Sequence, residues 1–358
     1  MSCSDHIAKC GHTSAEVSIV PASPCKSCQG KDDEICRLKL KMLEMEKKLD
    51  KAEIEYFGLE RLSTDDAQMA YYTGLPSYSV FKCLLSFLEP HLSAVHRHSD
   101  AAKGCERRLA PADELVMVLM RLRTGMHIKD LAYRFGFKSV SHVSVLLQRW
   151  ISFLSKVLDC LIIWPSRQQI KRNMPSAFQM SSEYKTIRCI LDCTEFAIQA
   201  PSALSLNAMT YSDYKGQHTV KILCCITPDG HISFVSKAFP GSISDNAITM
   251  RSGMLDLCEP GDRLLADKGF TISNTELQPR GVTLIVPPFR CGDAQFSPSE
   301  VKGTRKIAAL RVTVENAISR LKYYKLLKNT LPINSLHAAS DMIKVAAALT
   351  NFRPPLRK

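Results

Sequence analysis

Residues 189–199 read CILDCTEFAIQ, and this stretch decides the fold of the region around it. The run is as apolar as a buried β-strand, yet it carries Asp192 and Glu195. Burying a lone carboxylate costs several kcal/mol, so a strand keeps one only where something compensates for it. Alternation places Thr194 and Phe196 on the same face as Asp192, and Glu195 on the opposite face. We expect Glu195 to pair with a buried Lys or Arg and interpret Asp192 as a candidate functional residue.

Two further acids lie where they could reach the same cleft as Asp192. Asp267 ends the apolar run RLLAD, and Glu315 lies in the amphipathic stretch KIAALRVTVENAISRLKYYKLL at residues 306–327. Three converging carboxylates repel one another unless divalent cations bind, and Mg²⁺ prefers such hard oxygen ligands. Two ions of this kind suit phosphodiester transfer. The alternative is structural, with Asp192 bonded to backbone, Asp267 capping a turn and Glu315 paired with Arg311.

The region around these acids predicts a mixed α/β domain. The stretch TVKILCCITPDGHISFVSKAF at residues 219–239 reads as a β-hairpin that turns at Pro228–Gly230. A helix is expected from about residue 244 to 257, then short strands at RLLAD and VTLIVP, and last the long amphipathic helix that carries Glu315.

Residues 111–158 predict three helices in the outline of a helix-turn-helix. The first begins at Pro111 and stops near Gly125, and the second covers residues 128–135. Ser141 is expected to cap the third. An ordinary helical bundle would give the same pattern. If the motif docks DNA, its contacts are expected from side chains at or after the turn into the third helix, away from its core face: Lys138, His142, Ser144, Gln148 and Arg149.

The N-terminal part changes character near residue 33. Residues 1–32 lack hydrophobic periodicity and are expected to be disordered. From residue 33, apolar residues recur at steps of three and four, which predicts a coiled-coil dimer or one amphipathic helix docked on its own chain. The seam consists of Ile35, Leu38, Met42, Met45, Leu49, Ala52 and Tyr56.

Cysteines in the tail raise the question of a zinc site. Cys25 and Cys28 form a C-x-x-C pair, with Cys10, His12 and Cys36 nearby. A structural zinc site needs four ligands, and the sequence offers no second tight pair, so free thiols are the competing interpretation.

Composition sets the broad class. The chain has 358 residues, 45% of them hydrophobic, with 14 scattered cysteines, a net charge of +12 and a pI near 9.0. No apolar run is long enough for a membrane span, and the first residues do not resemble a signal peptide, so we expect a soluble intracellular protein without a membrane partner. The positive charge favours a polyanionic partner.

From about residue 64 to 335, the chain resembles the PIF/Harbinger-type DDE transposases, especially the animal branch often linked to THAP zinc fingers. The similar stretches occur in the order of the family: TGLPSYSVFKCLLSFL, the helix-turn-helix, LDCTEFAIQAPS, YSDYKGQHTVKILCCITPDGHISFVSKAFPGSISD, LLADKGF and RVTVENAISRLK. The THAP pattern, C-x(2–4)-C followed downstream by C-x-x-H, is absent from this sequence.

The resemblance implies an RNase-H-like nuclease domain whose acidic triad binds two Mg²⁺ or Mn²⁺ ions. The triad falls on Asp192, Asp267 and Glu315, which would be both catalytic residues and metal ligands. Asp245 also matches a motif position, and we interpret it as a helix-start residue near the site. The resemblance further implies a nuclear endonuclease and strand transferase acting on double-stranded DNA, at transposon ends and target.

Assembly and organisation follow the same interpretation. A homodimer or larger complex is expected, with a possible accessory DNA-binding protein. The expected order is a tail at 1–32, a coiled coil at 33–60, a helical region at 64–160 with a helix-turn-helix at 109–158, the DDE domain at 183–335, and a C-terminal helix and tail at 336–358. Two other functions stay open: a domesticated DNA-binding or protein-interaction module that keeps the fold without mobilisation, and a metal-dependent nuclease without strand transfer.

Overall fold

The computed structural model describes residues 26–55, 57–95, 109–182, 184–272, 274–287 and 298–357. The chain divides into two compact units, residues 1–55 and 56–358. No helix among these residues is both long and apolar enough to cross a membrane.

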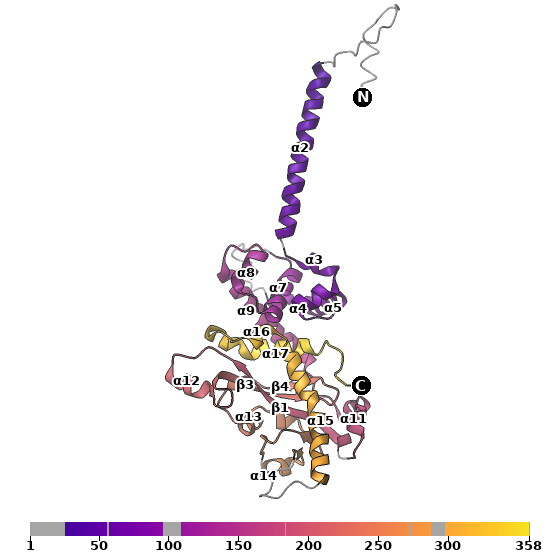
Figure 1. The fold of residues 1–358 in the computed structure, drawn as a ribbon, viewed down its shortest axis with the longest axis vertical. Helices are drawn as coiled ribbons and strands as arrows, with labels where there is room; N and C mark the ends of the chain where they lie inside the picture. Colours follow the sequence, from indigo (N-terminus) through magenta and orange to yellow (C-terminus); the bar gives the residue numbers. More distant parts are fainter. Residues whose placement is uncertain are drawn as a thin grey trace, which may run out of the picture. The chain divides into compact units, whose positions relative to one another are not determined.

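The first unit contains one long helix, α2 (Lys26–Glu55; Figure 1). It begins before residue 33, so residues 26–32, expected as part of the tail, are helical. Pro24 is the last proline before it, and the single Gly30 weakens a helix by only about 1 kcal/mol. The apolar side chains of the predicted seam are exposed: Ile35 49%, Leu38 49%, Met42 59%, Met45 63% and Leu49 60%. Cys10, His12, Cys25 and Tyr56 lie outside the described residues.

The second unit starts with a helical region. Its helices are α3 (Leu59–Ser63), α4 (Asp66–Thr73), α5 (Tyr78–Leu88), η1 (Glu89–Ala94), α7 (Pro111–Thr124), α8 (Ile128–Arg134) and α9 (Val140–Val157). The predicted start at Pro111 and stop at Gly125 are confirmed, because Gly125 takes a left-handed conformation with φ 68° and its N–H bonds to the Arg121 carbonyl. Helix α9 begins one residue before Ser141, which makes Ser139 the N-cap residue.

Short helices lead from this region into a mixed sheet. They are η2 (Leu158–Leu161), α10 (Arg167–Arg172), α11 (Ser176–Gln179) and η3 (Tyr184–Thr186). The sheet has the order β2-β3-β1-β6-β7, with β4 and β5 also pairing with β3. Its strands are β1 (Ile187–Ala197), β2 (Tyr211–Ser212), β3 (Gln217–Ile226), β4 (Ile232–Val235), β5 (Phe239–Pro240), β6 (Arg263–Leu265) and β7 (Thr283–Ile285). The predicted hairpin is confirmed as antiparallel β3 and β4, whereas β1, β6 and β7 are parallel.

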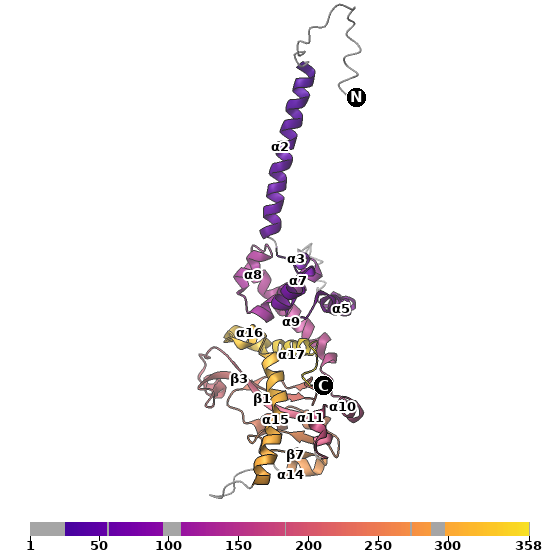
Figure 2. The ribbon, with the colours of Figure 1, turned by 45° about the vertical axis from the view of Figure 1, so that its right-hand side comes forward.

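The remaining helices lie between and after these strands. They are α12 (Leu204–Thr210), α13 (Asp245–Arg251), η4 (Met254–Leu257), α14 (Asn274–Leu277), η5 (Gln278–Arg280), α15 (Pro298–Leu321), α16 (Lys325–Lys328), η6 (Ile333–Ala338) and α17 (Ala339–Thr350). Figures 1 and 2 show α15 running alongside the sheet and α17 lying between the sheet and the helical region.

The two faces of the sheet belong to two hydrophobic cores. Phe196 and Ile222 pack in the larger core together with α15, α17 and the helix-turn-helix, which therefore shares its packing with the α/β part. Leu191 and Cys225 belong to the smaller core, which includes Ile248 of α13. Alternation along β1 places Asp192 on the face covered by α15, as the sequence predicts.

Candidate active site

Asp192 lies in the middle of β1, opposite Cys224 of β3. Burial raises the pKa of its carboxyl group to about 6, although the Arg311 guanidinium and the backbone N–H of Cys193 oppose the shift. The carboxylates of Asp267 and Asp245 add to the rise. An anion in this position is therefore unfavourable without a nearby cation.

Asp267 follows β6 and is brought beside Asp192 because β1 and β6 pair in parallel. Its Oδ1 accepts the N–H of Lys268 at 2.7 Å and forms an ion pair with Nη1 of Arg311 at 3.1 Å. Arg311 comes from α15, so this helix supplies the cation that faces both aspartates. Arg311 therefore pairs with Asp267, and not with Glu315 as the structural alternative predicted.

Asp245 is the first residue of α13, which Ser244 caps through its side chain, as predicted for a helix-start residue near the site. Its Oδ1 lies 3.3 Å from Nζ of Lys221. The turn after Asp267 packs against it, since a Cβ built on Gly269 would lie 3.2 Å from Oδ2 of Asp245. Glycine at position 269 therefore permits this close approach.

Lys221 is also the cation that pairs with Glu195. The two residues are directly opposite in the β1–β3 register, and Nζ of Lys221 lies 3.4 Å from Oε1 of Glu195. The hydroxyl of Thr219 donates to Oε2 at 2.8 Å. The predicted buried pair with a Lys or Arg is confirmed.

Glu315 is placed differently from the two aspartates. It is exposed and lies on α15 one turn after Arg311. Within the described residues, no group of three or more His, Cys, Asp or Glu side chains has an arrangement that could hold a metal ion. By donor chemistry Asp192 and Asp267 fit a divalent cation: one is a buried carboxylate and the other is paired with a guanidinium whose Nε is buried without a partner. The role of Glu315 stays a prediction.

The predicted DNA-contacting residues lie on α9 or, for Lys138, just before it. Lys138, His142, Gln148 and Arg149 are exposed, and Ser144 is half-buried. Ser144 and Gln148 line a small cavity of about 70 Å³ between α7, α9 and the C-terminal segment, and Nε2 of Gln148 lies 3.3 Å from Nε2 of His337.

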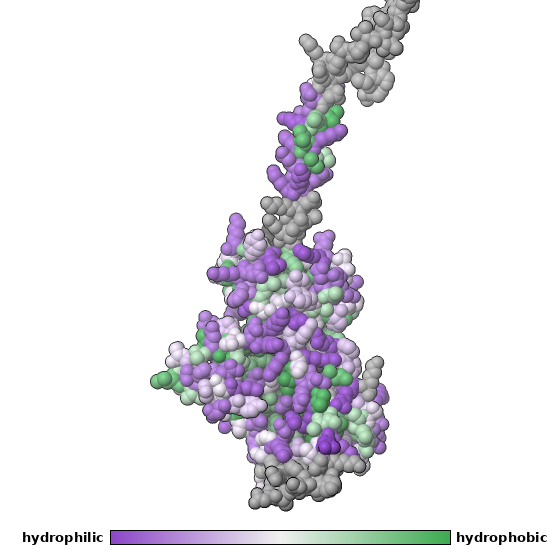
Figure 3. Space-filling model, viewed as in Figure 1, coloured by the Kyte–Doolittle hydropathy of each residue, from purple (hydrophilic) through white to green (hydrophobic). Residues whose placement is uncertain are grey.

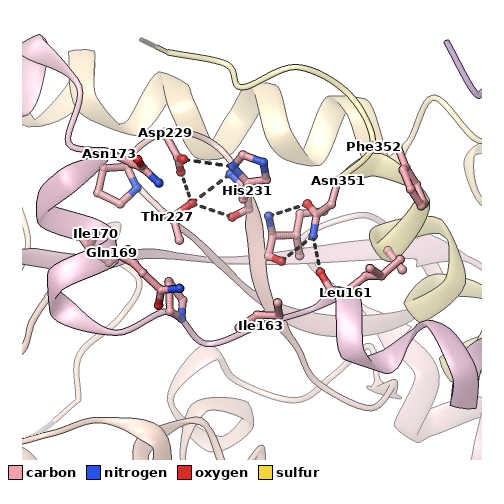
Figure 4. A pocket seen from close by; sticks show the side chains of 14 residues that line it. Leu161, Ile163, Gln169, Ile170, Asn173, Thr227, Asp229, His231, Asn351 and Phe352 are labelled. Atoms are coloured by element: carbon pink, nitrogen blue, oxygen red, sulfur yellow. Dashed lines mark hydrogen bonds and ion pairs between the residues drawn. The ribbon is translucent and has the colours of Figure 1, made fainter. Parts of the chain in front are cut away.

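A larger cavity of about 340 Å³ lies apart from these acids (Figure 4). It is bounded by the β3–β4 turn, α10 and the end of α17. In the turn, His231 donates to Asp229, whose carboxylate also accepts the hydroxyl of Thr227. Asn351 bridges the backbone of Ile232 and Leu161. None of the candidate acids lines this cavity, so its bonds connect the hairpin to the C-terminal segment rather than form the acidic site.

Two cations near the acids escaped prediction from the sequence. Lys221 could be found only from the strand register, which sequence alternation does not supply. Lys322 follows the end of α15, and its charge acts on Asp192 and Glu195. The sequence feature that could have indicated Lys322 is its position seven residues after Glu315, which is about two helical turns.

Two family models of known proteins match parts of the chain. The family model of the DDE superfamily endonuclease matches residues 191–351, and that of the helix-turn-helix of DDE superfamily endonuclease matches residues 107–160. Over these two regions the chain is similar to the Harbinger-type DDE superfamily endonucleases. Asp192, Asp267 and Glu315 lie in the endonuclease match, and the predicted DNA-contacting residues 138–149 lie in the helix-turn-helix match.

The relatives that the chain resembles include plant and animal proteins. It is 25% identical to Protein ALP1-like from Arabidopsis thaliana over 167 residues, 46% of this chain and 40% of the relative. It is 28% identical over 246 residues to HARBI1 from Mus musculus, which is named as a candidate nuclease, covering 66% of each chain. The rat protein of that name is 22% identical over 266 residues, 72% of this chain and 68% of the relative. The chain thus spans two fifths to about two thirds of these relatives, and no solved structure matches it.

Proposed function

We propose that this chain is a metal-dependent DNA endonuclease and strand transferase of transposon origin. The observation that carries the proposal is the meeting of Asp192 and Asp267 on the parallel strands β1 and β6, with Arg311 as their cation. Asp267 lies just after the carboxyl end of β6, where α/β folds place their sites, and Asp192 lies beside it on β1. Antiparallel β4, β3 and β1, continued by parallel β6 and β7, support the RNase-H-like assignment.

In this proposal the chain's own residues position the reacting groups. Asp192 on β1 and Asp267 after β6 would hold divalent ions, Mg²⁺ or Mn²⁺, and Glu315 would complete the set from α15. Two bound ions would activate the attacking oxygen and stabilise the leaving one. Arg311 forms an ion pair with Asp267, and its guanidinium would be suited to bind a substrate phosphate.

Cleavage of labelled duplex DNA that carries the ends flanking this gene tests the proposal. We expect Mg²⁺-dependent nicking by the wild-type protein and its loss, by at least a hundredfold, in Asp192→Asn and Asp267→Asn. Glu315→Gln should show the same loss if that residue is the third ligand. Undiminished nicking by the aspartate variants would show that the site has been misassigned.

DNA docking would fall to the helix-turn-helix, through the exposed side chains of Lys138, His142 and Arg149. Gln148 is exposed as well, with its amide 3.3 Å from His337, whereas Ser144 is half-buried beside the cavity between α9 and the C-terminal segment. We propose double-stranded DNA at transposon ends and target as the substrate, and the nucleus as the location. Two DNA ends must be held together, so we propose a homodimer or larger complex through α2, with an accessory DNA-binding protein as a further partner.

One observation favours a second function, a domesticated DNA-binding or interaction module without mobilisation. Glu315 is exposed, and an arginine rather than a third acid faces the two aspartates. Such a module would keep DNA binding while nicking stays absent with both Mg²⁺ and Mn²⁺. The cleavage experiment above separates the two functions.

A further inference from the structure

A basic cavity lies next to the acid cluster, and Glu195, Thr219 and Lys322 of that surrounding also line it. It has a volume of about 280 Å³ and is bounded by the ends of β1 and β3, the β2–β3 turn, and the segment from the end of α15 to α16. Its apolar lining comes from Phe196, Ala197 and Leu327. Gln217 and Thr219 add polar groups.

The charge of this cavity is positive. Lys215, Lys322 and Lys328 line it, and in the described part of the chain no carboxylate forms an ion pair with any of them. Glu195 is the one acid among the lining residues, and Lys221 already pairs with it. Burial and the neighbouring charge of Lys215 lower the pKa of Lys322. An anion would relieve this repulsion.

The β2–β3 turn, which supplies the lining residue Lys215, forms the rim of the cavity and carries an aromatic residue. Tyr214 is 83% exposed in the turn that joins β2 to β3, and Nζ of Lys215 lies 4.4 Å from the centroid of its ring. The turn is closed by the N–H of Gly216, which donates to the Ser212 carbonyl at 2.8 Å, and Gly216 needs its φ of 61°. Helix α12, which precedes β2, begins with the exposed Leu204, and Figure 3 shows hydrophobic residues where Figure 1 places α12.

The cavity is close enough to the acids to act on the same substrate. Phe196 follows Asp192 by four residues on the same strand face, which is about 13 Å along the strand. That length equals about four nucleotides of a B-form strand. The charge of Lys322 also acts on Asp192 directly.

We propose that this cavity and its rim bind an unpaired stretch of the DNA strand next to the cleavage point. The inference rests on the proposed function and deepens it. The three lysines bind phosphates, the exposed ring of Tyr214 stacks on one base, and the apolar lining receives another. Lysines that follow the backbone together with aromatic rings are how proteins hold single strands, and the face of any base can stack. A fully paired duplex could not offer its bases to this rim.

Binding of fluorescent oligonucleotides to the full chain, measured by anisotropy with Ca²⁺ in place of Mg²⁺, tests the inference. Two probes are compared, a forked duplex with an unpaired flank and the same sequence fully paired. Tyr214→Ala should weaken binding of the forked probe roughly 5- to 150-fold, and Tyr214→Phe should restore it. Lys322→Gln and Lys328→Gln should each reduce the slope of log K against log salt by about 0.7 on the forked probe.

Lys325→Gln is the matched control, because this exposed lysine lies on α16 but does not line the cavity. The inference is overturned if the cavity variants behave like this control, or if they weaken both probes equally. Tighter binding of single-stranded RNA of the same sequence would also overturn it. Since binding is measured without cleavage, failure here leaves the nuclease proposal standing, and an inactive nuclease leaves this result readable.

Discussion

The carboxyl group of Asp192 is held in a place that disfavours its charge. Burial raises its pKa to about 6 from the ordinary 3.8, and the Arg311 guanidinium offsets only part of that effect. A buried acid in this state stabilises the protein when a cation binds and destabilises it when none does. The same residue therefore links metal binding, pH and stability.

A pH series of unfolding free energies in EDTA tests this link. The folded pKa of Asp192 is raised, so its contribution to stability is complete below pH 3.8 and is lost as the pH rises through about 6. Compared with Asp192→Asn, the wild type should lose on the order of 2–3 kcal/mol between pH 4 and pH 7. Urea denaturation of both proteins measures the difference. A difference that stays constant with pH would contradict the assigned burial.

Glu195 makes a second residue-scale prediction. Its side chain is 6% exposed and is held by Lys221 and Thr219, so Glu195→Ala leaves a lysine short of one partner and a hydroxyl without an acceptor. We expect a loss of about 2–4 kcal/mol in urea unfolding. The matched control is Glu259→Ala, which breaks a surface pair with Arg167 and should cost less than about 1 kcal/mol. Equal losses would show that the buried pair is not stabilising.

At the residue scale, the sequence predicts which side chains are buried acids better than it predicts which cation pairs with each acid. The apolar run around Asp192 indicates a buried acid, and the same run indicates that Glu195 needs a cation. The identity of that cation depends on the β1–β3 register, which pairs Glu195 with Lys221. Which acid Arg311 faces depends on how α15 lies against the sheet, and a helical repeat alone suggested Glu315.

Helix α9 has one side that packs in the protein core and one side that is exposed. One side carries Trp150, whose Nε1 donates to Oε2 of the buried Glu114 at 2.8 Å, and the packing of α9 on α17 joins the helix-turn-helix to the α/β part. The exposed side carries His142, Gln148 and Arg149. Gln148 also contacts His337.

Salt-dependent DNA binding should separate these positions. Lys138→Ala should weaken binding to all sequences and reduce the salt slope by about one phosphate contact. Gln148→Ala should change affinity less than twofold, since its amide is already engaged by His337. If Gln148→Ala weakens a preferred sequence more than Lys138→Ala does, the helix presents a different face to DNA.

Element boundaries were predictable where a residue type forces them. Pro111 and Gly125 bound α7 because one has no N–H and the other takes a left-handed conformation. The start of α2 was not predictable from the sequence, because the polar residues 26–32 show no hydrophobic periodicity and are nevertheless helical. Strands β6 and β7 have three residues each, and only their pairing with β1 defines them.

At the scale of the whole molecule, α2 presents a hydrophobic seam and the second unit contains the candidate sites. Thirty residues of helix span about 45 Å, and apolar residues are visible along part of α2 in Figure 3. Two Met residues at seam positions specify packing weakly, so we expect weak self-association.

Light scattering tests the assembly. Leu38→Glu combined with Leu49→Glu should shift the free protein toward monomer, because each change places a charge in the seam. Lys39→Glu with Lys48→Glu, which alters charge outside the seam, is the control. The same mass for wild type and seam variant would show that α2 is not the dimer contact.

The most direct test of the central claim is Mn²⁺ binding measured by electron paramagnetic resonance on the full chain. The wild type should bind up to two ions, and Asp192→Asn and Asp267→Asn should each lose at least one while staying folded by circular dichroism. Asp256→Asn, which removes an exposed carboxylate paired with Arg280, should bind as the wild type does. Binding that is absent in the wild type, or unchanged in both aspartate variants, would contradict a metal-dependent site on β1 and β6.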